Sequence, residues 1–275
     1  MKRILVVMLI AQLGFCFQTM AQGDLLVTPS RIVFEGNKQK EQLNLLNMGQ
    51  DTATYTISFV QRSMKEDGSF VTIEKPDSGQ MFSDSYLRVF PRQVTLAPRE
   101  PQAILVQFRR KADMLAGEYR SHLYFRSEQN YKALGMGKSE DKMKQMNVQI
   151  KPIFGVSIPI IIRSGEVSVS VTLSNLELLP VKENTQYIKM TINRTGNIST
   201  FGDITVQYIP EKGKPVLIGT IAGVGVYTNI QKRNVILKLQ TASIKKFSLG
   251  KLKVQYIAKG VEKTFVYTEA ELKIK

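Results

Sequence analysis

Apolar and polar side chains alternate through residues 147–163, NVQIKPIFGVSIPIIIR. Because successive side chains of a β-strand point to opposite faces, this two-residue period predicts one strand with one apolar face. Strands are usually about 5–6 residues long, so this one should extend beyond its own sheet. Starting one residue earlier, the apolar face comprises Met146, Val148, Ile150, Pro152, Phe154, Val156, Ile158, Ile160 and Ile162, and the polar face begins with Asn147, Gln149 and Lys151 and ends with Arg163.

Shorter segments with strand character fill the rest of the chain, and no long helical period is present. Those before the long strand are RIVFEGN, QLNLLNM, TYTISFVQRS, YLRVFPRQVTL, AILVQFRR and YRSHLYFRS. After Ser164-Gly165 the pattern restarts, with EVSVSVTLSNLEL, YIKMTINRTG, GDITVQYIP, GVGVYTN, NVILKLQ, GKLKVQYIAKG and EKTFVYTEAELKIK. Each set of about seven strands separated by turn residues is typical of an immunoglobulin-like sandwich.

We therefore predict an all-β fold with two tandem immunoglobulin-like β-sandwich domains, over 22–163 and 164–275. The chain has 275 residues, 43% of them hydrophobic, which is enough for two cores. A short junction fed by a continuous strand should hold the domains at a fairly fixed angle. We expect a cleft between them.

Residues 1–21 carry the features of a secretory signal peptide. Lys2 and Arg3 precede an apolar run over 4–17, and the small residues Thr19 and Ala21 precede the expected cut after Ala21. The run is too short for a stable membrane anchor, and the alternative is a buried N-terminal strand or helix. We expect an exported protein without stable membrane insertion, located in the periplasm of a cell that has an outer membrane.

Few residues in the sequence could support catalysis. Cys16 is the only cysteine and lies in the signal peptide, so the mature chain would have no thiol for a disulfide, a metal or a nucleophile. Lipid attachment at Cys16 is the competing interpretation, against which the bulky Phe15 argues. His122, the only histidine, alternates with Arg120 and Tyr124, which predicts a solvated strand face. We therefore expect a binding protein with no metal, no cofactor and no enzymatic activity.

The formal net charge is +15, and removal of Lys2 and Arg3 with the signal peptide leaves +13. Such a charge favours acidic partners, but the basic residues are scattered along the strands, so we do not expect nucleic acid as a partner. The segment over 129–146 is rich in Gly and Lys and predicts a loop. It contains Gly137-Lys138-Ser139, the end of a phosphate loop, but Lys132 stands where the first glycine should be, so no nucleotide site is expected.

Several segments of the first domain resemble the periplasmic pilus-assembly chaperones. In VTPSRIVFEGNKQKEQLNLLNMG an arginine follows a TP-type turn and an asparagine ends the next strand. VTLAPREPQAILVQFRR and LAGEYRSHLYFR are similar to the middle of the same domain, and the long alternating strand ending in Arg163 is similar to its edge strand. The resemblance covers most of 25–165 and is looser over the second domain.

The resemblance implies a role for the excess strand. Pilin-type subunits are similar to sandwiches that lack their last strand, and a chaperone of this family lends them an alternating strand of its own. The donor side chains would be Met146, Val148, Ile150, Pro152 and Phe154, while the distal half of the strand would hold the chaperone's own core. The alternative is that the whole stretch is one long core strand.

The resemblance also assigns a subunit anchor in the cleft. Arg31 matches the family's cleft arginine, whose guanidinium would bind the subunit's terminal carboxylate. The family's second cleft residue is a lysine on the edge strand, and the matching position here is near Pro159. The nearest basic residue upstream, Lys151, is the remaining candidate, although it lies far along the strand.

Two further roles implied by the resemblance are structural. Asn47 would cap or turn the end of a strand, a task that suits an asparagine amide. Glu118 and Arg163 would belong to a buried ionic cluster between the domains. Plain surface positions are the alternative for all three residues.

The sequence thus predicts an ATP-independent periplasmic chaperone that binds and caps fimbrial or pilin subunits and delivers them to an outer-membrane usher or pore protein. The first alternative is a secreted two-domain adhesin or structural module. A more remote one is a hydrolase that acts on acidic glycans.

Overall fold

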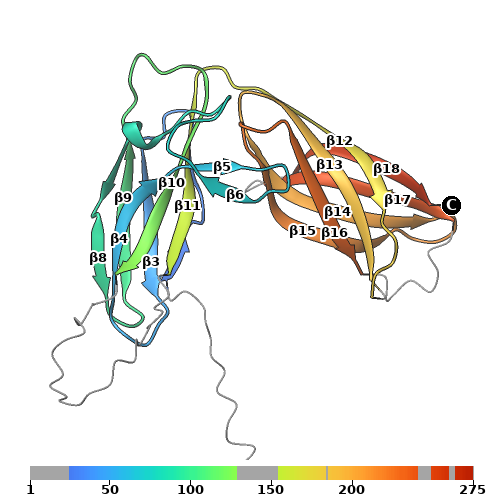
Figure 1. Cartoon of the computed structure of the whole chain (residues 1–275), viewed down its shortest axis with the longest axis horizontal. Coiled ribbons are helices and arrows are strands. Elements are labelled where there is room, and N and C mark those ends of the chain that lie inside the picture. Colours follow the sequence, from blue (N-terminus) through green and yellow to red (C-terminus); the bar gives the residue numbers. More distant parts are fainter. Residues whose placement is uncertain (1–24, 129–153, 184, 241–248, 260–263, 275) are drawn as a thin grey trace, which may run out of the picture.

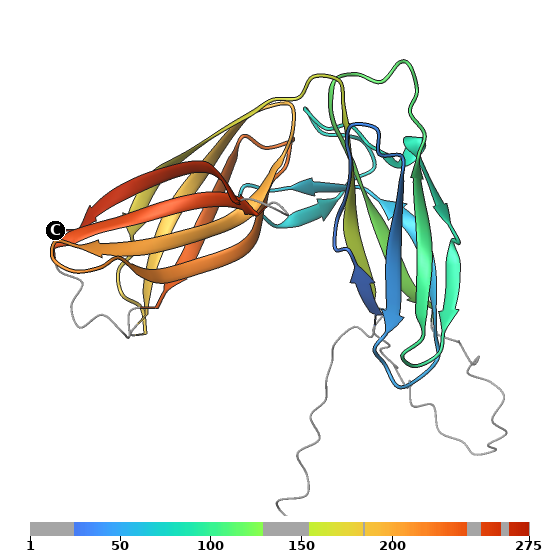
Figure 2. The same ribbon diagram turned by 180° about the vertical axis from the view of Figure 1, so that it is seen from behind.

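The computed structural model describes residues 25–128, 154–183, 185–240, 249–259 and 264–274. Their strands form two β-sandwiches, one from β1 to β11 and one from β12 to β18, which lie side by side at an angle (Figures 1 and 2). The all-β, two-domain prediction is confirmed. Over the described part of the chain, no helix has the length and apolar character to cross a membrane.

The first sandwich packs a four-stranded sheet against a five-stranded one. The first sheet has the order β1 (Leu25–Thr28), β3 (Lys40–Asn47), β9 (Pro101–Phe108), β7 (Leu87–Phe90). The second has the order β2 (Ile32–Phe34), β11 (Gly155–Ser164), β10 (Gly117–Glu128), β4 (Ala53–Val60), β8 (Gln93–Leu96). Alternate side chains such as Leu43 and Leu45 in β3 are fully buried between the sheets, as the two-residue period requires.

The second sandwich has the same two-layer construction. A sheet of β12 (Val169–Leu178), β13 (Gln186–Gly196) and β16 (Lys232–Leu239) faces a sheet of β15 (Val216–Val226), β14 (Thr200–Pro210), β17 (Gly250–Lys259) and β18 (Thr264–Ile274). Its core includes Ile188, Met190 and Tyr256, all fully buried. Each domain therefore has a hydrophobic core of its own.

Two segments predicted as single strands are divided. YLRVFPRQVTL passes from β7 in one sheet to β8 in the other at Pro91, which has no N–H to offer a ladder. TYTISFVQRS forms β4 and then β5 (Arg62–Met64), which pairs with β6 (Phe70–Thr72) in a separate hairpin. In Figure 1 this hairpin reaches across from the first domain to the second. A one-turn 3-10 helix (Asp84–Tyr86) follows it.

The described part of the long alternating strand is β11. On its even face Ile158, Ile160 and Ile162 are buried in the first core, as expected for its distal half. One edge of β11 pairs with β10 along its whole length, and the other pairs in parallel with β2 over residues 160–162 only. Within the described structure, residues 155–159 therefore have an unpaired edge.

Candidate binding cleft between the domains

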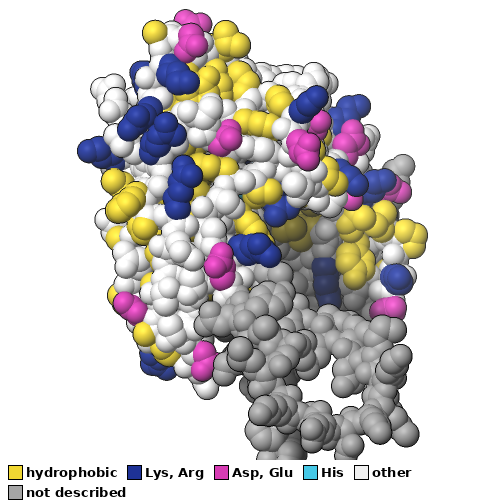
Figure 3. Space-filling model, turned by 60° about the vertical axis from the view of Figure 1, so that its left-hand side comes forward, with side chains coloured by type: hydrophobic (Ala, Val, Ile, Leu, Met, Phe, Trp, Pro, Cys, Tyr) yellow, Lys and Arg dark blue, Asp and Glu magenta, His cyan; other side chains and the backbone are white. Residues whose placement is uncertain are grey.

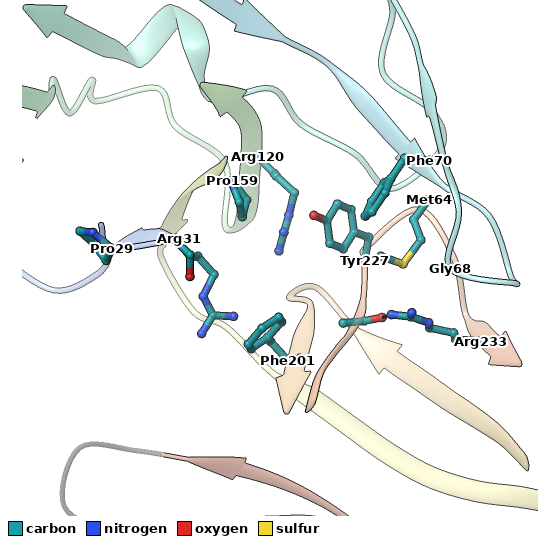
Figure 4. Close-up of a pocket in the computed structure, with 13 residues that line it drawn as sticks. Pro29, Arg31, Met64, Gly68, Phe70, Arg120, Pro159, Phe201, Tyr227 and Arg233 are labelled. Carbon is teal, nitrogen blue, oxygen red and sulfur yellow. Dashed lines mark hydrogen bonds between the residues drawn. The ribbon is translucent and has the colours of Figure 1, made fainter. Parts of the chain in front are cut away.

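A cavity of about 430 Å³ opens between the two domains (Figure 4). The first domain contributes Arg31, Phe70 and Arg120 to its wall, and the second contributes Phe201, Tyr227 and Arg233. The wall has three arginines but no acidic side chain among the described residues. Its chemistry suits an anion that carries an apolar group.

Arg31 is held in this cavity by strand pairing. It directly precedes β2, and continuing the parallel β2–β11 register by one residue places it beside Pro159, which lines the same cavity. Its guanidinium lies 4.0 Å from the centroid of the Phe201 ring, on the opposite domain. Such a cation–π contact orients the charge without neutralising it.

The charge of Arg31 has no carboxylate partner in the described part of the chain. Among the described residues no ion pair or hydrogen bond of its guanidinium is found. Burial, and then the positive charges of Arg120 and Arg163, lower the pKa of Arg31 from its usual value of 12.5. A bound anion would counteract both effects, because an opposite charge nearby favours the charged guanidinium.

Phe201 forms the floor of the cavity on the second domain. It pairs across the β14–β15 ladder with Gly225, and its ring lies against the β15 backbone at Gly223 and Gly225. Because these two positions have no side chains, one face of the ring is open to the cavity, where Arg31 approaches it.

Glu118 joins the two domains beside the cavity. Its side chain is fully buried, with one oxygen accepting bonds from Arg120 at 2.6 and 3.0 Å and the other accepting from the Ser199 amide at 3.0 Å and hydroxyl at 2.7 Å. Arg163, its partner across the β10–β11 ladder, lies 3.8 Å from that second oxygen. The predicted pair is therefore brought together, with Ser199 supplied by the second domain.

The arginines and Ser199 of this cluster favour the charged form of Glu118. Burial alone would raise the pKa of Glu118, but the charge of Arg120 and the hydrogen bonds from Arg120 and Ser199 hold it below 4.5. Arg120 also lies over the Tyr227 ring, with 3.7 Å between its central carbon and the ring centroid. Arg120 is thus paired with Glu118, whereas Arg31 has no ion pair with any described residue.

His122 is buried, and the predicted solvated face is wrong. Its exposed fraction is 4%, and its Nε2 lies 3.1 Å from the hydroxyl of Tyr227 in the second domain. Burial, and then the charges of Arg120 and Arg62, lower its pKa to about 3. Alternation along a strand shows that Arg120 and His122 share a face, but it cannot show that a second domain covers that face.

The β5–β6 hairpin closes the cleft on one side. The side-chain amide of Asn229 donates to the Ser63 hydroxyl at 3.0 Å and to the Met64 carbonyl at 2.8 Å. Phe70 lies with its ring centroid 5.3 Å from that of Tyr227. The hairpin therefore belongs to the first domain in sequence but packs on the second.

Four of the predicted donor residues, Met146, Val148, Ile150 and Pro152, lie outside the described residues. The candidate second anchor, Lys151, also lies outside them.

Phe154 is described and lies directly before β11, with 47% of its surface exposed. Together with Leu25, Tyr55 and Phe125 it lines a second cavity of about 280 Å³ at the end of the first sandwich.

Asn47 is the last residue of β3 and is fully buried. Its amide nitrogen donates to the carbonyls of Asp51 and Leu96 at 2.8 and 3.0 Å, and its oxygen accepts from the Gly49 amide at 2.9 Å. The side chain thus satisfies the backbone of the turn that follows the strand.

The second domain supplies cavity residues that the sequence did not suggest: Phe201, Tyr227 and Arg233. Each lies in a segment with ordinary strand alternation, and no local motif marks them. The sequence resemblance to pilus-assembly chaperones is looser over the second domain, so it did not point to these three residues either.

Comparison with solved structures finds chains of similar arrangement. The CsuC–CsuE chaperone–tip adhesion subunit complex of Acinetobacter baumannii has a TM-score of 0.46 at 12% identity, covering 90% of this chain and 98% of that one. The YadV chaperone has a TM-score of 0.45 at 10% identity, covering 92% of this chain and 100% of that one. The class 5 fimbriae chaperone CfaA has a TM-score of 0.44 at 13% identity, covering 90% of this chain and 98% of that one.

No family model and no curated protein sequence matches the chain. All three TM-scores lie below 0.5. The CsuC structure belongs to Csu pili and the CfaA structure to class 5 fimbriae.

Proposed function

We propose that this protein is an ATP-independent periplasmic chaperone that binds fimbrial or pilin subunits by their C-terminal strand. The observation that carries the proposal is the guanidinium of Arg31, which lies in the cleft between the domains without a carboxylate partner among the described residues. A peptide C-terminus supplies that carboxylate through charge-assisted hydrogen bonds. The apolar part of the cavity accepts the terminal side chain.

The open edge of β11 gives the bound strand its path. A client strand whose terminal carboxylate is at Arg31 ends beside Pro159. The residues before its terminus lie along residues 155–159, where the described structure leaves the edge of β11 unpaired. Its C-terminus points in the same direction as that of β11, so the added strand is parallel to β11. It continues the line of β2, which is also parallel to β11. Main-chain hydrogen bonds along this edge provide binding that does not depend on the client's sequence.

The alternating face over 146–154 then acts as the donor strand. Its apolar side chains enter the groove that an incomplete subunit exposes, which protects both partners from aggregation. The subunit passes to an outer-membrane usher by exchanging this strand for that of another subunit. Such an exchange needs no nucleotide and no cofactor.

Recovery of a client tests the proposal. The tagged parent protein, Arg31→Ala and the exposed control Arg88→Ala are purified from periplasmic extract, and bound proteins are identified by mass. We expect a fimbrial subunit with the parent and with Arg88→Ala, and a large loss with Arg31→Ala. Equal recovery with both variants would remove Arg31 from the site. A chain displayed on intact cells without any client would instead support the adhesin or structural module.

A further inference from the structure

Carboxylate and main-chain binding would not distinguish one client strand from another. Every extended peptide with a free C-terminus has a terminal carboxylate and a main chain that can pair with a strand edge. Surface charge is not selective either, because Lys, Arg, Asp and Glu side chains are intermingled on the face of the molecule in Figure 3. Selection among clients would need a pocket for a particular side chain.

A cavity of this kind opens in the first sandwich, at the start of β11. Its volume is about 280 Å³, and its wall includes Leu25, Tyr55, Phe125, Phe154 and Val156. The first three of these side chains are buried in the core of the first domain. The cavity is thus an opening into the hydrophobic core, where empty space costs contacts that an apolar side chain would supply.

The cavity lies where the seam between the two sheets is open. β1 is an edge strand of the four-stranded sheet, and in the five-stranded sheet β2 covers β11 over residues 160–162 only. Leu25 lines the cavity from β1, and Val156 lines it from β11. Within the described structure no strand pairs with the β11 edge between them, so a strand added along residues 155–159 would close the seam.

The two faces of β11 are clearly distinguished at this point. Val156 pairs with Phe125 across the β10–β11 ladder and packs against the first core. Gly155 has the ring of Tyr124 against it, so closely that any side chain at position 155 would collide with that ring. Because side chains alternate along a strand, position 156 points to the cavity and position 155 to the outer face.

The register places one side chain of a bound strand in the cavity. Val156 lies three residues before Pro159, so a parallel client strand that ends beside Pro159 has the residue three positions before its terminus beside Val156. Side chains that are neighbours across a sheet point to the same face. This client side chain therefore points inward with Val156, while those directly before and after it point outward.

We propose that this cavity is a selective subsite for a large apolar side chain, carried by the residue three positions before the client's C-terminus. The side chain fills the gap in the core while the client's main chain closes the seam. This assignment rests on the proposed chaperone function. It adds that the protein selects its clients by one apolar side chain that binds outside the cleft.

Two acetylated strand peptides with a free C-terminal carboxylate test the assignment. They are identical except for leucine or alanine three positions before the terminus, and each is titrated by NMR into the full mature protein. The leucine peptide should bind about tenfold more tightly, because it buries the larger apolar side chain. It should also shift the methyl signals of Ala53 and Val156, which line the cavity, more strongly than the alanine peptide does.

Filling the cavity from the protein's own side should remove this preference. Ala53→Leu places a larger side chain in the cavity wall, so the two peptides should then bind about equally. Ala53→Val is the smaller change and should reduce the preference in part, and melting curves show whether each variant folds. Ala103→Leu makes the same change as Ala53→Leu at an exposed position of β9 outside the cavity, and it should keep the full preference.

Arg31→Ala separates this assignment from the proposed function. It should weaken both peptides by the same factor and leave the preference for leucine unchanged. If the parent binds both peptides equally and Arg31→Ala weakens both, the anchor at Arg31 stands and the cavity is not a client subsite. A folded Ala53→Leu or Ala53→Val variant with the full preference would also overturn the subsite. If the parent binds neither peptide, the proposed client path and the subsite are both wrong.

Discussion

Ser199 binds the buried carboxylate of Glu118 through both its backbone amide, at 3.0 Å, and its hydroxyl, at 2.7 Å. Ser199 belongs to the second domain and lies two residues before Phe201, while Glu118 lies in β10 of the first. The contact therefore fixes the strand that carries Phe201 opposite Arg31. The shape of the cleft depends on a polar cluster outside it.

Replacing Glu118 by Gln should destabilise the protein strongly. The variant keeps the shape of the side chain but leaves the nearly buried Arg120 without its counter-charge. Removing one partner of a buried ion pair costs about 3–5 kcal/mol. Urea unfolding measures the loss, and Glu35→Gln, which removes only the exposed partner of Arg163, is the matched control. A loss below about 1 kcal/mol would show that Glu118 behaves as a surface charge.

The free energy of unfolding should decrease as the pH is lowered, because of His122. Its pKa is about 3 when folded and 6.5 in a model compound, so the unfolded chain binds the proton more readily. The stabilisation is therefore complete above pH 6.5 and is lost as the pH falls toward 3, by up to about 1.4 kcal/mol per pH unit. In urea unfolding at pH 7 and 5, His122→Gln should show a smaller difference than the parent. An unchanged difference would assign the effect to other groups.

Glu118 should add to this loss at lower pH. Its folded pKa lies below 4.5, so its contribution is complete above that value and is lost as the pH falls through the folded pKa. The two residues thus act in successive windows, His122 first. Unfolding of Glu118→Gln below pH 4.5 should depend on pH less steeply than unfolding of the parent.

Phe201 should matter for binding more than for folding. The residue is 43% exposed, yet its ring supports the guanidinium of Arg31 at 4.0 Å. Loss of a cation–π contact of this kind is worth about 0.5–1 kcal/mol, or roughly a twofold to fivefold loss of client affinity in Phe201→Leu. Phe90→Leu, at an exposed phenylalanine that does not line the cavity, is the control. Equal affinities for the two variants would exclude Phe201 from positioning Arg31.

The strands could be predicted from the sequence because burial within one sandwich follows a two-residue period. Leu43 and Leu45, or Ile158 and Ile160, are apolar at alternate positions, and their burial needs no knowledge of other segments. Arg31 could be proposed because it lies in a local motif that resembles known chaperones. These features are encoded within a few neighbouring residues.

The rest of the site depends on contacts between distant segments. His122 and Tyr227 are 105 residues apart, and Asn229 meets Ser63 across 166 residues. Nothing in the alternation around His122 indicates that another domain covers it. Arg233 likewise lies in a strand that looks ordinary, and only the closure of the two domains brings it to the cavity of Arg31.

The donor strand should tolerate charge in the free protein but not in the complex. Replacing Val148 and Ile150 together by Asp places two charges where the proposal puts the client's apolar groove. Burying an unpaired charge costs several kcal/mol or more, so subunit recovery should fall sharply. If this half of the strand is an exposed edge in the free chaperone, the variant should melt near the parent temperature.

The opposite face of the same stretch provides the control. Asn147 and Gln149 alternate with Val148 and Ile150, so replacing them by Asp adds the same charge on the face that points away from the groove. This variant should retain the subunit, because its new carboxylates stay in water. A Val148/Ile150 variant that unfolds on its own would show that these residues belong to the protein's own core. The strand would then be a long core strand, and the donor mechanism would lose its main support.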